Sequence, residues 1–269
     1  MALPVNRGSR YVGGPAGPRR AWDALGLALR DYWRGHLRAS VQVHRADGVS
    51  YPMPARLFFR GRSALSSLER MALRLCRGRI LDVGAGAGCH SLLLQARGFE
   101  VTALDVSPHA VSVMRRRGLR RVARGEAMAP PPGPFDTVLL LMNGIAVVGT
   151  LAGLRRFLRR VGASLPADGQ VLFDSLDLRR DPLSRPGALA RARHAGRYFG
   201  ELCFRLEYRG RMGPPFRLLF VDPARLVREA RDAGWRCEVI LRAAQGRYLA
   251  RLTPPPQRAR KPRQERSNA

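Results

Sequence analysis

Short, mostly apolar runs alternate with amphipathic stretches through most of the chain. Runs that predict strands occupy residues 80–83, 98–105, 135–142 and 170–174. Stretches with apolar residues on one helical face occupy residues 91–96, 108–118 and 151–161. Strands that are apolar on both sides are typical of a sheet that helices cover on both faces. The alternation therefore predicts an α/β fold with a mostly parallel, doubly wound sheet.

The pattern differs at the N-terminal side of this alternation. Residues 21–33 and 64–75 each have one apolar helical face, and residues 41–44 have the pattern of a short strand. Pro52 and Pro54 argue against regular structure after that strand, because proline has no backbone N–H to donate. We therefore expect a mainly helical preface before the sheet.

The C-terminal part predicts antiparallel pairs. Residues 202–208 alternate with period two, residues 209–211 form a turn, and residues 216–221 can pair back. This is the pattern of a β-hairpin inserted before the last helix, which spans residues 223–233. A final antiparallel pair then completes the sheet.

Together these segments predict a three-layer sandwich around a seven-stranded sheet, with an N-terminal helical preface and a β-hairpin insert. The predicted divisions are a preface at residues 21–78, a main domain at 79–253, its insert at about 199–221, and tails at 1–20 and 254–269. Because the tails are rich in Pro, Gly or Arg and poor in large apolar residues, they are expected to be disordered and basic.

The glycine-rich stretch after the first strand of the sheet carries the clearest chemistry. The strand at residues 80–83 is followed by Gly84, Gly86 and Gly88, and then by a helix. A strand, a glycine turn and a helix make half of a βαβ unit, and such units bind ligands at the carboxyl ends of their strands. Glycine allows a ligand to lie against bare backbone there.

Two carboxylates at strand ends indicate which ligand this is. Asp105 ends the second strand, where its two oxygens can accept both hydroxyls of a ribose. Asp82 precedes the glycines, where a carboxylate suits an amino group better than a pyrophosphate. The third glycine of the dinucleotide-binding pattern is also missing, because Cys89 stands at its place. The pattern favours a nucleoside that is not NAD.

This stretch closely resembles the first motif of the class I S-adenosylmethionine-dependent methyltransferases, and the resemblance runs from about Arg79 to Leu178 and more loosely to Leu252. It implies a Rossmann-like methyltransferase fold with S-adenosyl-L-methionine as the cofactor. In this family Asp105 would hold the ribose and Glu126 the adenine amino group. The preface would partly cover the nucleotide site, with Phe59 and Arg60 as candidates for that role. The cofactor-binding residues that the resemblance implies are Asp82, Gly84, Ala85, Gly86, Gly88, Asp105, Val106, Glu126, Ala127 and Met142.

The methyl acceptor is expected beside the ends of the next two strands. The resemblance places Asn143 and Asp174 there as catalytic candidates. The hairpin around Tyr208 and the loop that holds His194 and Tyr198 would close over them. Nucleic-acid amino methyltransferases carry an Asn/Asp-Pro-Pro-aromatic motif where this chain has Asn143 followed by Gly144. Its absence, with the hairpin insert, favours transfer to an N, O or C nucleophile of a small molecule or modified peptide. An RNA-directed methyltransferase and a non-catalytic protein that retains the fold are the alternatives.

The charge of the chain bears on its partners. The net charge is +28, and all but one of the 48 basic residues are arginines, Lys261 being the exception. Such a charge attracts polyanions, so weak, non-specific binding of nucleic acid is expected. The four cysteines are scattered without a metal-ligand spacing, which predicts no metal site and a reducing, cytoplasmic location. No apolar run is long enough to span a membrane.

Overall fold

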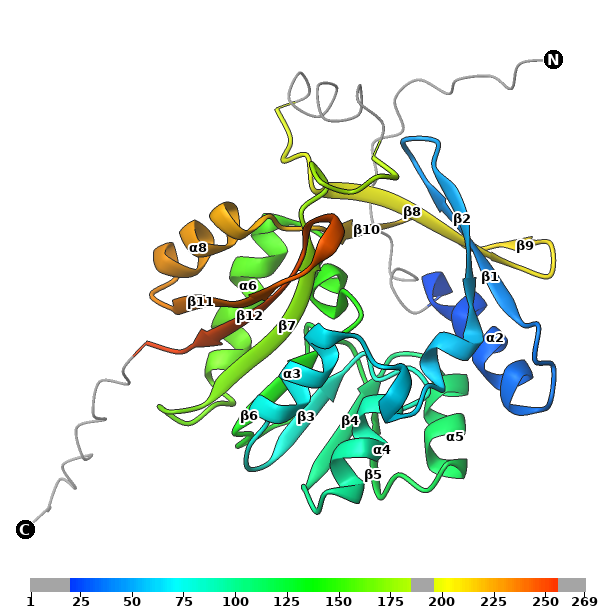
Figure 1. The fold of residues 1–269 in the computed structure, drawn as a ribbon, viewed down its shortest axis with the longest axis horizontal. Coiled ribbons are helices and arrows are strands. Elements are labelled where there is room, and N and C mark those ends of the chain that lie inside the picture. Colours follow the sequence, from blue (N-terminus) through cyan, green and yellow to red (C-terminus); the bar gives the residue numbers. More distant parts are fainter. Residues whose placement is uncertain (1–19, 185–195, 256–269) are drawn as a thin grey trace, which may run out of the picture.

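The computed structural model describes residues 20–184 and 196–255 in two β-sheets with flanking helices (Figure 1). The two predicted tails, apart from residues 20, 254 and 255, and the candidate His194 lie outside these residues. The strands are β1 (Ser40–Arg45), β2 (Ser50–Pro54), β3 (Ile80–Val83), β4 (Val101–Asp105), β5 (Arg121–Arg124), β6 (Thr137–Leu140), β7 (Gln170–Leu176), β8 (Glu201–Tyr208), β9 (Arg211–Met212), β10 (Phe216–Leu219), β11 (Arg236–Arg242) and β12 (Arg247–Thr253). The α-helices are α2 (Asp23–Trp33), α3 (Ser67–Leu75), α4 (Cys89–Ala96), α5 (Pro108–Arg116), α6 (Leu151–Gly162) and α8 (Pro223–Asp232). Three short 3-10 helices that matter below are η1 (Ala55–Phe58), η2 (Arg62–Ala64) and η3 (Gly144–Val148).

The seven-stranded sheet has the order β11-β12-β7-β6-β3-β4-β5. The five strands from β7 to β5 pair in parallel, and β12 and β11 add an antiparallel pair at the β7 edge. The mostly parallel, doubly wound sheet is thereby confirmed. Its chain order reverses between β3 and β6, so the ends of β3, β4 and β6 lie around the point where α/β sheets bind ligands.

Local signals set several helix starts. The Ser66 hydroxyl accepts a hydrogen bond from the N–H of Glu69, and the Glu69 carboxylate accepts one from the N–H of Ser66, so α3 begins with a complete capping box. The Ser107 hydroxyl caps α5 by accepting a hydrogen bond from the N–H of Ala110. Asp222 accepts from two N–H groups at the start of α8. The predicted starts of α5 and α8 are confirmed.

The second sheet joins two segments that are far apart in the sequence. Its order is β10-β8-β1-β2, with β9 paired to β8, so the predicted hairpin insert pairs with a hairpin from the N-terminal segment. The register places Val43 opposite Leu206, and both side chains are buried in an apolar cluster with α2. Figure 1 shows β1 and β2 beside α2, with β8 and β10 reaching back toward the larger sheet. The sequence indicated the insert hairpin and a strand at residues 41–44, but neither the β1–β2 hairpin nor its pairing with the insert.

The prediction against regular structure at Pro52 and Pro54 was wrong. Both prolines lie in β2, where Pro52 is opposite Gln42 and Pro54 is opposite Ser40. Because β2 is an edge strand with β1 on one side only, a missing N–H that faces away from β1 costs no ladder hydrogen bond. Proline on an edge strand also hinders pairing with another chain.

Two contacts attach this second sheet and its helix to the larger one. Helix α2 packs on α5, and Gly26 lies so close to the Ser107 side chain that a Cβ there would collide with it. At the other end β10 contacts η3, where a Cβ on Gly149 would lie 3.3 Å from the carbonyl oxygen of Arg217. Ser107 follows the end of β4, and η3 follows the end of β6. The second sheet is therefore anchored beside the carboxyl ends of the central strands.

The arginines of α6 lie on its outer side. Arg156 and Arg159 are exposed, whereas Leu154 and Phe157 are buried against the sheet.

Over residues 20–184 and 196–255, no helix combines the length and the apolar character needed to cross a membrane.

Candidate active site

The three glycines of the turn after β3 all have backbone angles that favour glycine. Their φ values are 72° at Gly84, 59° at Gly86 and 80° at Gly88. Their surroundings differ. A Cβ at Gly84 would meet no atom within 4 Å, whereas one at Gly86 would lie 2.8 Å from the Phe58 ring and one at Gly88 would lie 2.5 Å from Leu119. Gly84 therefore borders open space, and Gly88 is required for packing of α5 against the turn.

Asp105 holds the glycine turn and the start of α5 together. Its Oδ2 accepts the N–H of Gly86 and its Oδ1 accepts the N–H of Ser107, each at 2.9 Å. Burial raises the pKa of this carboxyl to about 6, against the lowering effect of these hydrogen bonds. A carboxylate has about four lone-pair positions, so both oxygens can accept further hydrogen bonds. The Asp105 carbonyl also accepts the N–H of Gly125 at 3.0 Å, which brings Glu126 beside this strand end.

Asp82 lies deeper than Asp105. Its side chain is buried, and its Oδ2 accepts a 2.5 Å hydrogen bond from the hydroxyl of Ser91 on α4. Burial raises its pKa, while nearby His90 and the hydrogen bonds from Ser91 act in the opposite direction. Asp82 therefore joins the end of β3 to the first turn of the helix that follows the glycines.

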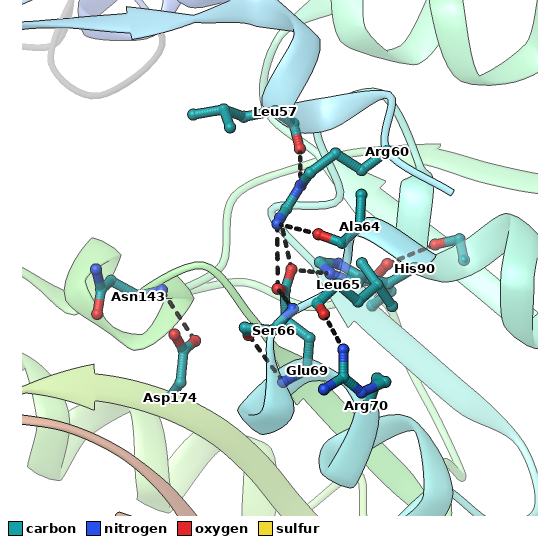
Figure 2. Close-up of polar contacts among 12 residues, drawn as sticks. Leu57, Arg60, Ala64, Leu65, Ser66, Glu69, Arg70, His90, Asn143 and Asp174 are labelled. Atoms are coloured by element: carbon teal, nitrogen blue, oxygen red, sulfur yellow. Dashed lines mark hydrogen bonds and ion pairs between the residues drawn. The ribbon is translucent and has the colours of Figure 1, made fainter. Parts of the chain in front are cut away.

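A buried ionic network lies on the α3 side of the glycine turn (Figure 2). Glu69 Oε1 accepts from Nη2 of Arg60 at 2.6 Å and pairs with Nε2 of His90 at 2.8 Å. Arg60 also donates to the carbonyls of Leu57 and Ala64, at 2.7 and 3.2 Å. One carboxylate thus joins the loop before α3, the start of α3 and the start of α4.

The protonation of this network follows from its contacts. Burial disfavours the charged form of Glu69, but hydrogen bonds from His90 and Ser66 outweigh it and lower the pKa to about 2. Burial likewise lowers the pKa of His90, but bonds to Cys89 and Glu69 raise it to about 10. At neutral pH the network therefore contains an imidazolium, a carboxylate and a guanidinium.

Asn143 and Asp174 come together at the ends of β6 and β7, as expected for neighbouring parallel strands (Figure 2). The backbone N–H of Asn143 donates to Oδ1 of Asp174 at 2.9 Å. Met142 and Asn143 are consecutive non-glycine residues in the left-handed region, with φ of 60° and 58°. Such a turn is strained, so the Asp174 hydrogen bond stabilises a conformation that the chain would otherwise avoid.

Asp174 also pairs with an arginine, and the side chain of Asn143 has an oxygen without a hydrogen-bond partner among the described residues. Nη2 of Arg247 on β12 lies 3.4 Å from Oδ2 of Asp174. Burial raises the pKa of Asp174, and Arg247 opposes this rise. The side-chain oxygen of Asn143 is buried without a hydrogen-bond partner in the part of the chain that the structure describes. Because an unpaired buried carbonyl is costly, this oxygen is available to a donor on a bound molecule.

The chain has clear relatives among known proteins. The family described as a methyltransferase domain matches residues 56–238. A ubiquinone biosynthesis O-methyltransferase from Xanthomonas euvesicatoria is 30% identical, over 72% of this chain and 76% of that protein. The crystal structure of an S-adenosylmethionine-dependent methyltransferase from Bacteroides fragilis, bound to S-adenosyl-L-homocysteine, is 34% identical with a TM-score of 0.77, covering 88% of this chain and 97% of that one. This chain is a class I S-adenosylmethionine-dependent methyltransferase.

A more local similarity connects the methyltransferase to RNA-modifying relatives. A 23S rRNA (uracil(747)-C(5))-methyltransferase from Pyrococcus horikoshii is 35% identical, over 27% of this chain and 18% of that protein. Membership of the methyltransferase family also excludes the alternative of a non-catalytic protein that only retains the fold, because the chain is an enzyme.

The residues of this methyltransferase fit its cofactor, S-adenosyl-L-methionine. Open space at Gly84 leaves room for a ligand against the backbone. Beyond its bonds to Gly86 and Ser107, the Asp105 carboxylate can accept a further hydrogen bond from a ribose hydroxyl, and Glu126 lies two residues after the end of the neighbouring strand β5. When bound, the cofactor supplies a methyl group that its sulfonium has already activated. Among the described residues, no group of three or more His, Cys, Asp and Glu side chains could hold a metal.

The preface contributes residues that the sequence did not single out. Phe59 and Arg60 were the expected covering residues, but the ring that faces the glycine turn is Phe58. The Phe59 ring instead packs 4.6 Å from that of Tyr32, and Arg60 is paired with Glu69. Glu69 itself was missed, although Ser-x-x-Glu before an apolar helical face is a recognisable capping signal.

The tyrosines expected near the acceptor bond to carboxylates elsewhere. The Tyr208 hydroxyl donates to Asp31 of α2 at 2.9 Å. The Tyr198 hydroxyl donates to Asp222 at the start of α8 at 2.7 Å. Both phenols therefore hold the second sheet and its connection in place.

Proposed function

We propose that this methyltransferase transfers the methyl group to an N, O or C nucleophile of a small molecule or a modified peptide. The observation that carries the proposal is the second sheet, which with α2 packs on the segments that follow β4 and β6. An acceptor that approaches the end of β6 has to fit beside this sheet. Such a boundary favours a small acceptor over a folded RNA.

We assign the cofactor to the carboxyl ends of β3, β4 and β5. Gly84 and Gly86 would lie against the methionine and ribose portions, with Asp105 on the ribose hydroxyls. Glu126 and the N–H of Ala127 would contact the adenine. The other proposed cofactor-binding residues are Asp82, Ala85, Gly88, Val106 and Met142, of which Asp82 and Gly88 also have structural contacts.

We assign the acceptor to the end of β6. The unpaired side-chain oxygen of Asn143 would accept a hydrogen bond from an N–H or O–H of the acceptor. Asp174 supports this position by holding the Asn143 backbone, and it could take a proton if the acceptor must lose one. Holding the nucleophile in line with an activated methyl supplies much of the rate.

The relatives favour oxygen as the first acceptor atom to test. The protein from Xanthomonas euvesicatoria, which aligns over most of this chain, is named as an O-methyltransferase of ubiquinone biosynthesis. The rRNA methyltransferase aligns over only 27% of this chain, so it supports the RNA alternative weakly.

The decisive experiment is methyl transfer in fractionated extract. The purified enzyme is incubated with S-adenosylmethionine carrying an isotopically labelled methyl group and with separate small-molecule, peptide and RNA fractions. Mass spectrometry should find label in a small molecule or peptide, and Asn143→Ala should reduce it. Label found mainly in RNA at physiological salt would contradict the proposal and favour the RNA alternative.

A further inference from the structure

A hollow lies away from the proposed cofactor residues, between α6, α8 and the chain that leads into β8. Its volume is about 530 Å³. The side chains of interest in its lining are Arg155, Arg197 and Arg225, the rings of Tyr198 and Phe199, and Glu201. Three arginines around one hollow, with aromatic rings beside them, suggest a binding site for an anion.

A buried carboxylate fixes two of these arginines. Glu229 has a side chain that is only 2% exposed, and its Oε2 accepts from Nη1 of Arg155 at 2.5 Å. Its Oε1 accepts from Nε of Arg225 at 2.8 Å. One carboxylate therefore holds a guanidinium from α6 and one from α8, and the group keeps one excess positive charge. Pre-positioned guanidinium groups lose less conformational entropy when they bind an oxyanion.

The aromatic side of the hollow is also held in place. The guanidinium of Arg225 lies 5.7 Å from the centre of the Tyr198 ring, a cation–π distance. The hydroxyl of Tyr198 donates to the Asp222 carboxylate and accepts the Asp222 N–H at 2.8 Å. The Phe199 ring lies 4.6 Å from that of Tyr198. A fixed aromatic surface thus lies next to a fixed cation.

Both guanidinium groups retain donors for a ligand. Each has five N–H groups. Within residues 20–184 and 196–255, the guanidinium groups of Arg155 and Arg225 bond only to Glu229, apart from the cation–π contact of Arg225. The two side chains are 45% and 33% exposed, so their remaining donors are open to solvent.

We propose that this hollow binds a small molecule in which an oxyanion, phosphate or carboxylate, is attached to a flat apolar group. The oxyanion would lie between Arg155 and Arg225, and the flat group against Tyr198 and Phe199. Glu201 limits the charge of the ligand: its carboxylate already accepts the N–H of Leu151 at the start of α6 and would repel a second anionic group.

The experiment is calorimetric titration of the full-length protein at low ionic strength, where screening is weak. The probes are inorganic phosphate, phenyl phosphate and benzoate. Phenyl phosphate should bind about five times more tightly than phosphate, because its ring packs on the aromatic surface. Whichever of phenyl phosphate and benzoate binds with the higher affinity identifies the preferred oxyanion. Arg155→Gln and Arg225→Gln should each weaken binding about tenfold, the scale of a charged hydrogen bond.

Three controls separate this site from the general positive charge of the protein. Arg159→Gln removes an exposed arginine from the same helix and should leave binding unchanged. Glu201→Gln can still accept the Leu151 N–H but carries no charge, so binding should strengthen. The affinity for S-adenosylhomocysteine should be the same in all variants, which shows that they are folded. No binding of any probe, or an equal loss in Arg159→Gln, would overturn the proposal.

Discussion

The ionic network around Glu69 gives the sharpest prediction about the stability of this methyltransferase. Glu69→Ala removes the one carboxylate that Arg60 and His90 share. It also removes half of the capping box of α3. The fold keeps all its apolar core contacts, so the change acts on electrostatics and hydrogen bonds.

The magnitude follows from burial. The side chains of Glu69 and His90 are 5% and 6% exposed, and breaking a buried ion pair by removing one partner costs about 3–5 kcal/mol. Loss of the cap contributes within the usual range of about 0.5–2 kcal/mol. His90 can relieve part of this cost by losing its proton, because burial alone lowers its pKa. We therefore expect the free energy of unfolding to fall by about 3–5 kcal/mol in total.

The assay is urea unfolding at pH 7, followed by tryptophan fluorescence. The matched control is Glu100→Ala, which removes the partner of Arg121 in a pair whose side chains are 45% and 57% exposed. An exposed pair contributes about 0–1 kcal/mol, so the control should remain close to wild type. If Glu69→Ala cost no more than Glu100→Ala, the network would not be a buried ionic one.

The same network predicts a pH dependence that His90→Asn should remove. The pKa of His90 is about 10 in the fold against 6.5 as a reference, so its stabilising contribution is complete below pH 6.5 and is lost as the pH rises toward 10. Across this interval the wild type should lose stability relative to His90→Asn. Parallel curves for the two proteins between pH 6.5 and 10 would contradict a charged His90.

Three further predictions concern the proposed site. Asp105→Ala should weaken S-adenosylhomocysteine binding by about 1–3 kcal/mol in calorimetry, through lost hydrogen bonds to a charged group, and an unchanged affinity would remove Asp105 from the ribose site. Gly84→Val should abolish that binding, and Gly118→Val should affect it much less. Both glycines have positive φ and open surroundings, but only Gly84 borders the proposed cofactor. Asn143→Ala should lower turnover with cofactor affinity nearly unchanged, since its contact is to the acceptor, and equal turnover would reduce it to a turn residue.

The sequence was sufficient for the larger sheet because each of its strands carries a local signal. The apolar runs that contain β3 and β6 can each be recognised without knowledge of their neighbours. The glycines, Asp82 and Asp105 could be singled out for the same reason, since they follow predicted strands or lie at or near their ends. Their meeting at one edge follows from parallel pairing.

The sequence was insufficient where pairing is non-local. Whether β8 pairs with β1 or stays a free hairpin depends on apolar contacts with α2, and no spacing in the chain encodes them. Phe58 was passed over in favour of Phe59 because a 3-10 helix, unlike a strand or an α-helix, has no strong apolar period. Glu69 was missed because its partners lie on other segments.

The partnership of β8 with β1 has a consequence for how the acceptor region is assembled. β8 is the central strand of the second sheet, with β10 on one side and β1 on the other. β10 contacts η3 beside the end of β6, whereas α2, which packs on the same sheet, contacts Ser107 beside Asp105. Of these two contacts, the insert supplies the one beside the proposed acceptor position, and the N-terminal segment supplies the one beside the proposed cofactor position.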